Sequence, residues 1–227
     1  MNKLILKILM TISLSGNHFA YPQDFPGDTI EGIQDEPKVF TIDSGRSFLR
    51  VFVGRAGLLS EMGHNHIITS KNITGNLSYL SPPLISTAIF SIPVQALIID
   101  DDSERKNAGD EYNSVPSISD RQGTKSNMLS NSVLDANNYP IIQLDVEGIS
   151  INNKLNTYNV KISIKNQTIF QALPALVNFN DNTMAIDANF VLDHSQLKLK
   201  PFSILAGMLR VAEQLRFELH VEAFNNL

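Results

Sequence analysis

The sequence of 227 residues contains no cysteine and no tryptophan. The lack of cysteine excludes disulfides, thiolate metal sites, iron–sulfur clusters and cysteine nucleophiles. The lack of tryptophan excludes Trp stacking platforms for bases and Trp belts at a membrane interface. Basic runs are also missing and the formal net charge is −5, which argues against nucleic acid as a partner. What remains is a chain with 43% hydrophobic residues, enough for a sizeable core.

Apolar runs of transmembrane length are missing too, and the N-terminus carries a shorter one. Lys3 and Lys7 precede the mostly apolar stretch Ile8–Leu14, and small and polar residues follow it. This order is typical of a secretory signal, and the stretch is too short to span a bilayer core of about 30 Å. We expect residues 1–20 to be a signal peptide and the Pro-containing residues 21–37 an irregular lead-in. The mature protein is then periplasmic or secreted, without stable membrane insertion; the alternative is a buried N-terminal helix.

Alternation of apolar and polar residues predicts an all-β fold. From Leu215 to Ala223 every second residue is apolar and the others are polar, which is typical of a strand with one buried face. Similar stretches recur without a long helix between them, at about 39–43, 48–54, 73–79, 86–92, 142–147, 158–165 and 184–192. We predict an antiparallel β-barrel of about eight strands, because closure removes exposed edges. Such a barrel is either filled by its own side chains or holds one small ligand.

The long crossover in the middle of the chain has a different composition. Asp100 to Ser126 is rich in charged and small polar residues, which predicts an exposed loop. Ser126 is a suitable N-cap for one short helix over Asn127–Ala136, and Pro140 would stop it.

The order of several short motifs is similar to that of a known family. The motifs are Val39–Asp43, Ile73–Leu77 after Gly63-His64, Met128–Asp135 with Tyr139-Pro140, and Phe202–Val211 before the last strand. Over Lys38–Phe224 the chain resembles the YceI-like family of exported bacterial proteins. The resemblance implies a lipocalin-like antiparallel barrel with a helix in its long crossover, a periplasmic location, and an apolar cavity that holds an isoprenoid or similar lipid. The chain departs from the family at His194–Leu197, where members often have an aromatic residue and glycine.

Two apolar clusters in loops are candidates for the ligand site. Leu58, Leu59 and Met62 lie between predicted strands, where apolar residues need a cover. Phe202 and Leu205 belong to a second cluster before the final strand. Either cluster could line the mouth of a cavity, since each buried methylene of a lipid contributes about 0.8 kcal/mol. The alternative is that both clusters are plugs packed into the end of the barrel.

His64 and His66 are the sharpest local motif for a metal. Residues two apart on a strand point to the same side, so both imidazoles could reach one ion. A third ligand would have to come from outside this strand, and the candidates are Glu61, Asp193, His194 and His220. The alternative is a polar pair bonded to backbone or water.

No residue set predicts catalysis. Asp193-His194-Ser195 has the residue types of a hydrolase triad, but triad members come from separated segments and no G-x-S-x-G elbow is present. We interpret these residues as a turn and expect a protein that is not an enzyme and that carries no cofactor other than a bound isoprenoid-type lipid.

Two functional hypotheses follow. The first is non-catalytic binding or transport of an apolar lipid, such as a polyisoprenoid, in the periplasm. The second is a metal- or haem-linked redox or stress protein that uses His64 and His66. The sequence leaves open whether the protein forms a homodimer.

Overall fold

The computed structural model describes residues 36–80, 86–150, 152–180 and 182–225. The expected signal peptide and nearly all of the expected lead-in lie outside these residues.

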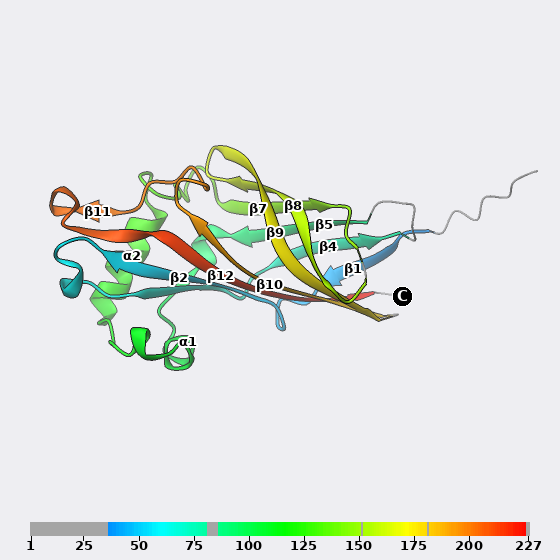
Figure 1. Cartoon of the computed structure of the whole chain (residues 1–227), viewed down its shortest axis with the longest axis horizontal. Helices are drawn as coiled ribbons and strands as arrows, with labels where there is room; N and C mark the ends of the chain where they lie inside the picture. The colour runs from blue at the N-terminus through cyan, green and yellow to red at the C-terminus, as the bar shows by residue number, and fades with distance from the viewer. Residues whose placement is uncertain (1–35, 81–85, 151, 181, 226–227) are drawn as a thin grey trace, which may run out of the picture. The chain divides into compact units, whose positions relative to one another are not determined.

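The alternating stretches form antiparallel strands that close into a barrel, as predicted (Figure 1). Eight strands make the ring, in the order β1–β4–β5–β7–β8–β9–β10–β12 and back to β1. Their bounds are Lys38–Ile42 (β1), Thr74–Tyr79 (β4), Thr87–Pro93 (β5), Ile141–Glu147 (β7), Leu155–Ile164 (β8), Gln167–Asn180 (β9), Thr183–Asp193 (β10) and Leu209–Asn225 (β12). The all-β, lipocalin-like fold class is therefore confirmed.

Four further strands extend the sheet at one end of the barrel. They are β2 (Phe48–Ala56), β3 (His66–Ser70), β6 (Ile98–Ile99) and β11 (Ser203–Ile204). β12 is long enough to pair with β1 near its C-terminus and with β2 over Arg210–His220, while β10 follows its other edge. The β2–β12 register shifts between Val211 and Leu215, which marks a bulge.

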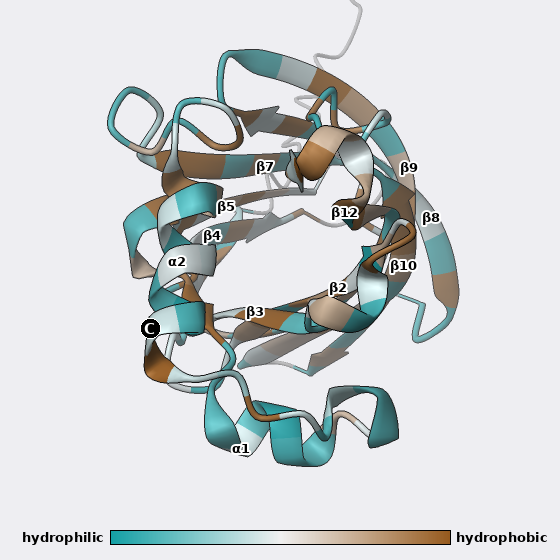
Figure 2. Ribbon diagram, turned by 90° about the vertical axis from the view of Figure 1, so that its left-hand side faces the viewer, coloured by the Kyte–Doolittle hydropathy of each residue, from teal (hydrophilic) through white to brown (hydrophobic). Residues whose placement is uncertain are grey.

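The barrel interior is lined by the apolar face of each strand. On β2, Leu49, Val51 and Val53 pack toward the main core, whereas Phe52 on the opposite face is buried against Tyr112. Figure 2 shows the alternation as bands of hydrophobic and hydrophilic residues along the strands. Both faces of β2 are therefore covered over this stretch.

The crossover contains two α-helices, so the predicted exposed loop over Asp100–Ser126 was wrong in its secondary structure, although most of its residues are exposed. Helix α1 spans Asp102–Asn107 and α2 spans Ile118–Leu129. The polar residues that suggested a loop are caps: Asp101 accepts hydrogen bonds from the first turn of α1. Ser117 and Asp120 cap α2 reciprocally, each side chain bonding the other residue's backbone N–H. Local capping thus offsets the lack of apolar residues.

The predicted position of the helix, Asn127–Ala136, was wrong, because most of α2 lies before this range. α2 begins at Ile118 rather than after Ser126 and ends at Leu129. Turns follow, closed by hydrogen bonds from Val133 N to Ser130 O and from Tyr139 N to Asp135 O. The apolar residues at helical spacing are therefore split between the end of α2 and these turns.

Within the described part of the chain, no helix is both long and apolar enough to cross a membrane.

Candidate functional site

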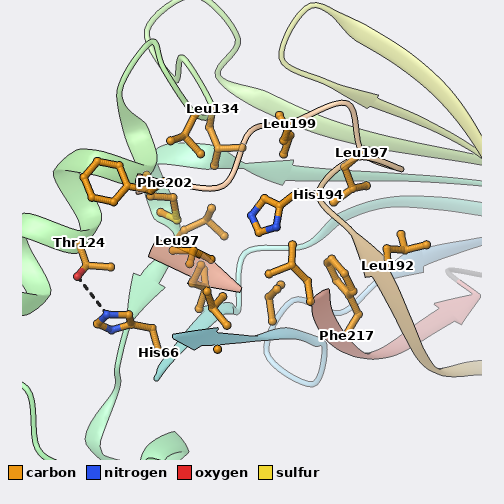
Figure 3. A pocket seen from close by; sticks show the side chains of 18 of the residues that line it. His66, Leu97, Thr124, Leu134, Leu192, His194, Leu197, Leu199, Phe202 and Phe217 are labelled. Carbon is orange, nitrogen blue, oxygen red and sulfur yellow. Dashed lines mark hydrogen bonds between the residues drawn. The ribbon is translucent and has the colours of Figure 1, made fainter. Parts of the chain in front are cut away.

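A cavity of about 320 Å³ lies inside the barrel at the end that carries α2. In Figure 2, which looks at this end, α2 stands on one side of the ring of strands and β10 and β12 on the other. Strands contribute inward residues such as Val51, Ile162, Leu192 and Phe217, and the loop after β10 contributes Leu197 (Figure 3). The volume falls in the usual range of ligand pockets, about 300–1,000 Å³, and the lining is mainly apolar.

A second, smaller cavity of about 60 Å³ lies against some of the same side chains. Leu144, Leu173, Phe190 and Leu219 line both spaces. The smaller cavity is also lined by Phe90 and other residues from the middle of the barrel. The two spaces therefore share part of their apolar wall.

Polar side chains collect where the larger cavity meets solvent. The polar lining residues that are partly or fully exposed are Arg55, His64, His66, Thr124, Asn127 and Arg210. Arg55 is held by its own loop, because Nη1 donates to the carbonyls of Ser60 and Gly63 at 3.0 and 3.1 Å. The cavity thus has an apolar interior and a polar rim.

His66 is fixed at this rim by a buried aspartate. Its Nδ1 donates to Asp100 Oδ2 at 2.6 Å, and its Nε2 lies 3.5 Å from Thr124 Oγ1 on α2 (Figure 3). The side chain of Asp100 is fully buried and also accepts hydrogen bonds from Arg105 Nη1 at 2.6 Å and from the Ile67 N–H at 2.9 Å. Arg105 in turn bonds the carbonyls of Asn65, Tyr112 and Ser114. The network fastens the crossover to β3.

The pKa of Asp100 reflects these contacts. Burial raises it, but the hydrogen bonds from His66, the Ile67 N–H and Arg105, together with the nearby His66 charge, outweigh burial. The pKa is therefore held below its usual value, and the carboxylate stays ionised inside the protein.

His64 and His66 lie near each other without forming a metal site with the predicted third ligands. Their ring centroids are 6.3 Å apart and the rings are inclined at 73°. Glu61 pairs with Arg55, and His220 pairs with Asp187 on the outer face. Among the described residues, no three His, Asp or Glu side chains gather as a metal would require.

The predicted ligand residues divide into two groups. Phe202 lines the cavity, as do its neighbours Ile204 and Leu209. Leu58, Leu59, Met62 and Leu205 do not line it, and Leu58 and Met62 are 89% and 71% exposed. The side chains of Leu58 and Met62 are therefore not packed into the end of the barrel. The backbone N–H of Leu59 donates to the carbonyl oxygen of Met208 at 2.8 Å, which joins this loop to the loop before the final strand. A role for Leu58, Leu59, Met62 and Leu205 in ligand entry stays a prediction.

Sequence reasoning missed His194 as a cavity residue. The interpretation of Asp193-His194-Ser195 as a turn agrees with hydrogen bonds from Gln196 N to Asp193 O and from Leu199 N to His194 O. That turn, however, directs the imidazole of His194 into the cavity beside Leu197 and Leu199 (Figure 3). The only advance signal was the departure from the family pattern at this position.

The sequence matches no protein-family model and no curated protein. Solved structures do match. A polyisoprenoid binding domain from Saccharophagus degradans, described as implicated in plant cell wall breakdown, has a TM-score of 0.55 and 9% identity, covering 82% of this chain and 98% of that one. BcnA of Burkholderia cenocepacia has a TM-score of 0.54 and 16% identity, covering 80% and 98%.

A mutant YceI protein of Campylobacter jejuni gives a TM-score of 0.50 at 11% identity, covering 70% of this chain and 85% of its own. At these identities the similarity establishes the arrangement of the strands and not the ligand. The resemblance read from the order of the sequence motifs is confirmed at this level, and the chain has the YceI-like fold.

Proposed function

We propose that this protein binds the apolar chain of a lipid, such as a polyisoprenoid, inside its barrel, and that it acts as a carrier rather than an enzyme. The observation that carries the proposal is the cavity of about 320 Å³ with its apolar interior and polar rim. The name of the Saccharophagus degradans domain supports the same class of ligand. The signal-like N-terminus supports a periplasmic site of action.

Affinity should depend on the length of the apolar chain. Each buried methylene contributes about 0.8 kcal/mol, which corresponds to about a fourfold gain in affinity. The gain should continue while the chain fills the larger cavity and end when no apolar space remains. A protein that binds only through its polar rim would not show this dependence.

The first test is to purify the protein, extract it with organic solvent and identify lipids by mass spectrometry. A titration with isoprenoid alcohols of increasing length should accompany it. Repeated recovery without lipid, together with no uptake of any alcohol in the series, would reject the proposal.

A matched pair of variants tests the location of the site. Val51→Phe places a larger side chain into the cavity from β2. Val191→Phe makes the same change on the outer face of β10, where Val191 is 46% exposed. We expect Val51→Phe to weaken binding of the longest chains and Val191→Phe to leave it unchanged. Equal effects of the two variants would place the ligand elsewhere.

A further inference from the structure

The interior of the larger cavity contains one buried polar side chain, His194. Among the described polar residues that line this cavity, the others are partly or fully exposed, whereas His194 is 6% exposed. Its neighbours in the lining include Leu192, Leu197 and Leu199 (Figure 3). A polar group in such surroundings costs free energy unless it finds a hydrogen-bonding partner.

The position of the proton on His194 follows from its backbone contact. Nδ1 lies 2.9 Å from the carbonyl oxygen of Glu213. Because a carbonyl can only accept, Nδ1 must donate, and in the neutral ring Nε2 then carries a lone pair. Nε2 has no hydrogen-bonding partner among the described residues and is not sealed by protein atoms, so it presents an acceptor to the cavity.

The bulge in β12 fixes this arrangement. Glu213 lies within the stretch between Val211 and Leu215 where the register with β2 shifts. Its carbonyl accepts from both the backbone N–H and Nδ1 of His194, and its side chain accepts from the Ser195 N–H at 2.9 Å. The loop after β10 is thus fastened to the bulge, and the imidazole has little freedom to turn away.

We infer that His194 selects lipids that carry a hydrogen-bond donor, such as a hydroxyl group, and holds that group inside the barrel. This inference rests on the proposed function and adds the chemical class of the ligand's polar group. An alcohol or a phenol can donate to Nε2, whereas a hydrocarbon, an ether, an ester or a quinone cannot. Burying a hydroxyl without a partner is unfavourable, and His194 supplies the partner.

The test compares two ligands with the same isoprenoid chain, geranylgeraniol and its methyl ether, which lacks the donor and has one more methyl group. Their affinities are measured by displacement of the fluorescent apolar probe N-phenyl-1-naphthylamine. Because the ether carries an extra methyl group, the quantity compared is the ratio of alcohol affinity to ether affinity in the unmodified protein and in the His194 variants. A net hydrogen bond between neutral groups makes this ratio about three- to tenfold higher in the unmodified protein, and an equal ratio would overturn the inference.

His194→Phe keeps a ring of similar size and removes the acceptor. The Glu213 carbonyl keeps the backbone donor of residue 194 in this variant. His194→Leu, which is apolar and has no acceptor, is the second variant in case the first fails to fold. His64→Phe makes the same change at the partly exposed rim and is the matched control.

We expect both His194 variants to lose the preference for the alcohol while they still bind the ether, and His64→Phe to keep the preference. A preference retained without His194, or lost equally with His64, would contradict the inference and leave lipid binding intact. If the unmodified protein binds neither ligand, the inference fails, and the proposed function fails as well if the protein also takes up no other alcohol of the series and is recovered without lipid.

Discussion

Replacement of Asp100 by asparagine should destabilise the protein strongly. The side chain of Asp100 is fully buried and holds the buried Arg105, whose side chain is 5% exposed. Its backbone φ of 53° lies in the left-handed region, which asparagine tolerates, so the variant tests the charge rather than the backbone. Breaking a buried pair leaves an unpaired charge and costs about 3–5 kcal/mol. The lower end, about 3 kcal/mol, is expected because Arg105 keeps three carbonyl partners.

The assay is urea and thermal unfolding of the protein, followed by circular dichroism. A loss of about 3 kcal/mol corresponds to a Tm about 6–12 °C lower for a domain of this size. Asp102→Asn is the control: its side chain is 83% exposed and pairs with Arg121, so the loss should stay below about 1 kcal/mol. If Asp100→Asn costs no more than Asp102→Asn, the buried network does not fasten the crossover as argued.

Four further outcomes are expected. Because the pKa of Asp100 is lower in the folded than in the unfolded protein, its contribution is complete above the unfolded value of about 3.9 and is lost as the pH falls below it. The free energy of unfolding should therefore fall less steeply with decreasing pH in Asp100→Asn than in the unmodified protein. Gly75→Ala should cost about 3 kcal/mol or more in urea unfolding, because φ is +145° and its Cβ would lie 1.9 Å from the Ile89 carbonyl oxygen. Gly123→Ala, within α2 and with no atom near its Cβ, should instead stabilise by up to about 1 kcal/mol. Leu58→Asp should change Tm by little, since the side chain is 89% exposed, and a large loss would show that this loop is a plug.

The barrel and most of the cavity lining could be predicted from the sequence. Phe217 and Leu219 belong to the alternating face of the last strand, and this face lines the cavity. The period-2 patterns indicate which residues share one face of the sheet. When the sheet closes, the residues on its inner face surround one common space. The patterns do not state whether side chains fill that space completely, because this depends on how inward residues from distant strands fit together.

The helices and His194 could not be predicted in the same way. α2 depends on reciprocal caps between Ser117 and Asp120 in a polar stretch without a strong apolar stripe. The role of His194 depends on the Glu213 carbonyl, which the bulge in β12 brings beside it. Such a contact between a turn residue and a strand distant in the sequence follows from the register of the folded sheet and has no local sequence signal.

The central claim, that an apolar chain binds inside the barrel, can be tested with a single fluorophore because the chain has no tryptophan. Phe217 lines the cavity and stacks on Phe190 with ring centroids 5.0 Å apart, so Phe217→Trp places a reporter inside. Phe170→Trp, at a position that is 71% exposed on β9, is the external control. Titration with geranylgeraniol should give a saturable change in emission at position 217 and none at position 170. A change confined to position 170, or no change at position 217 while displacement of the apolar probe reports binding, would contradict the account.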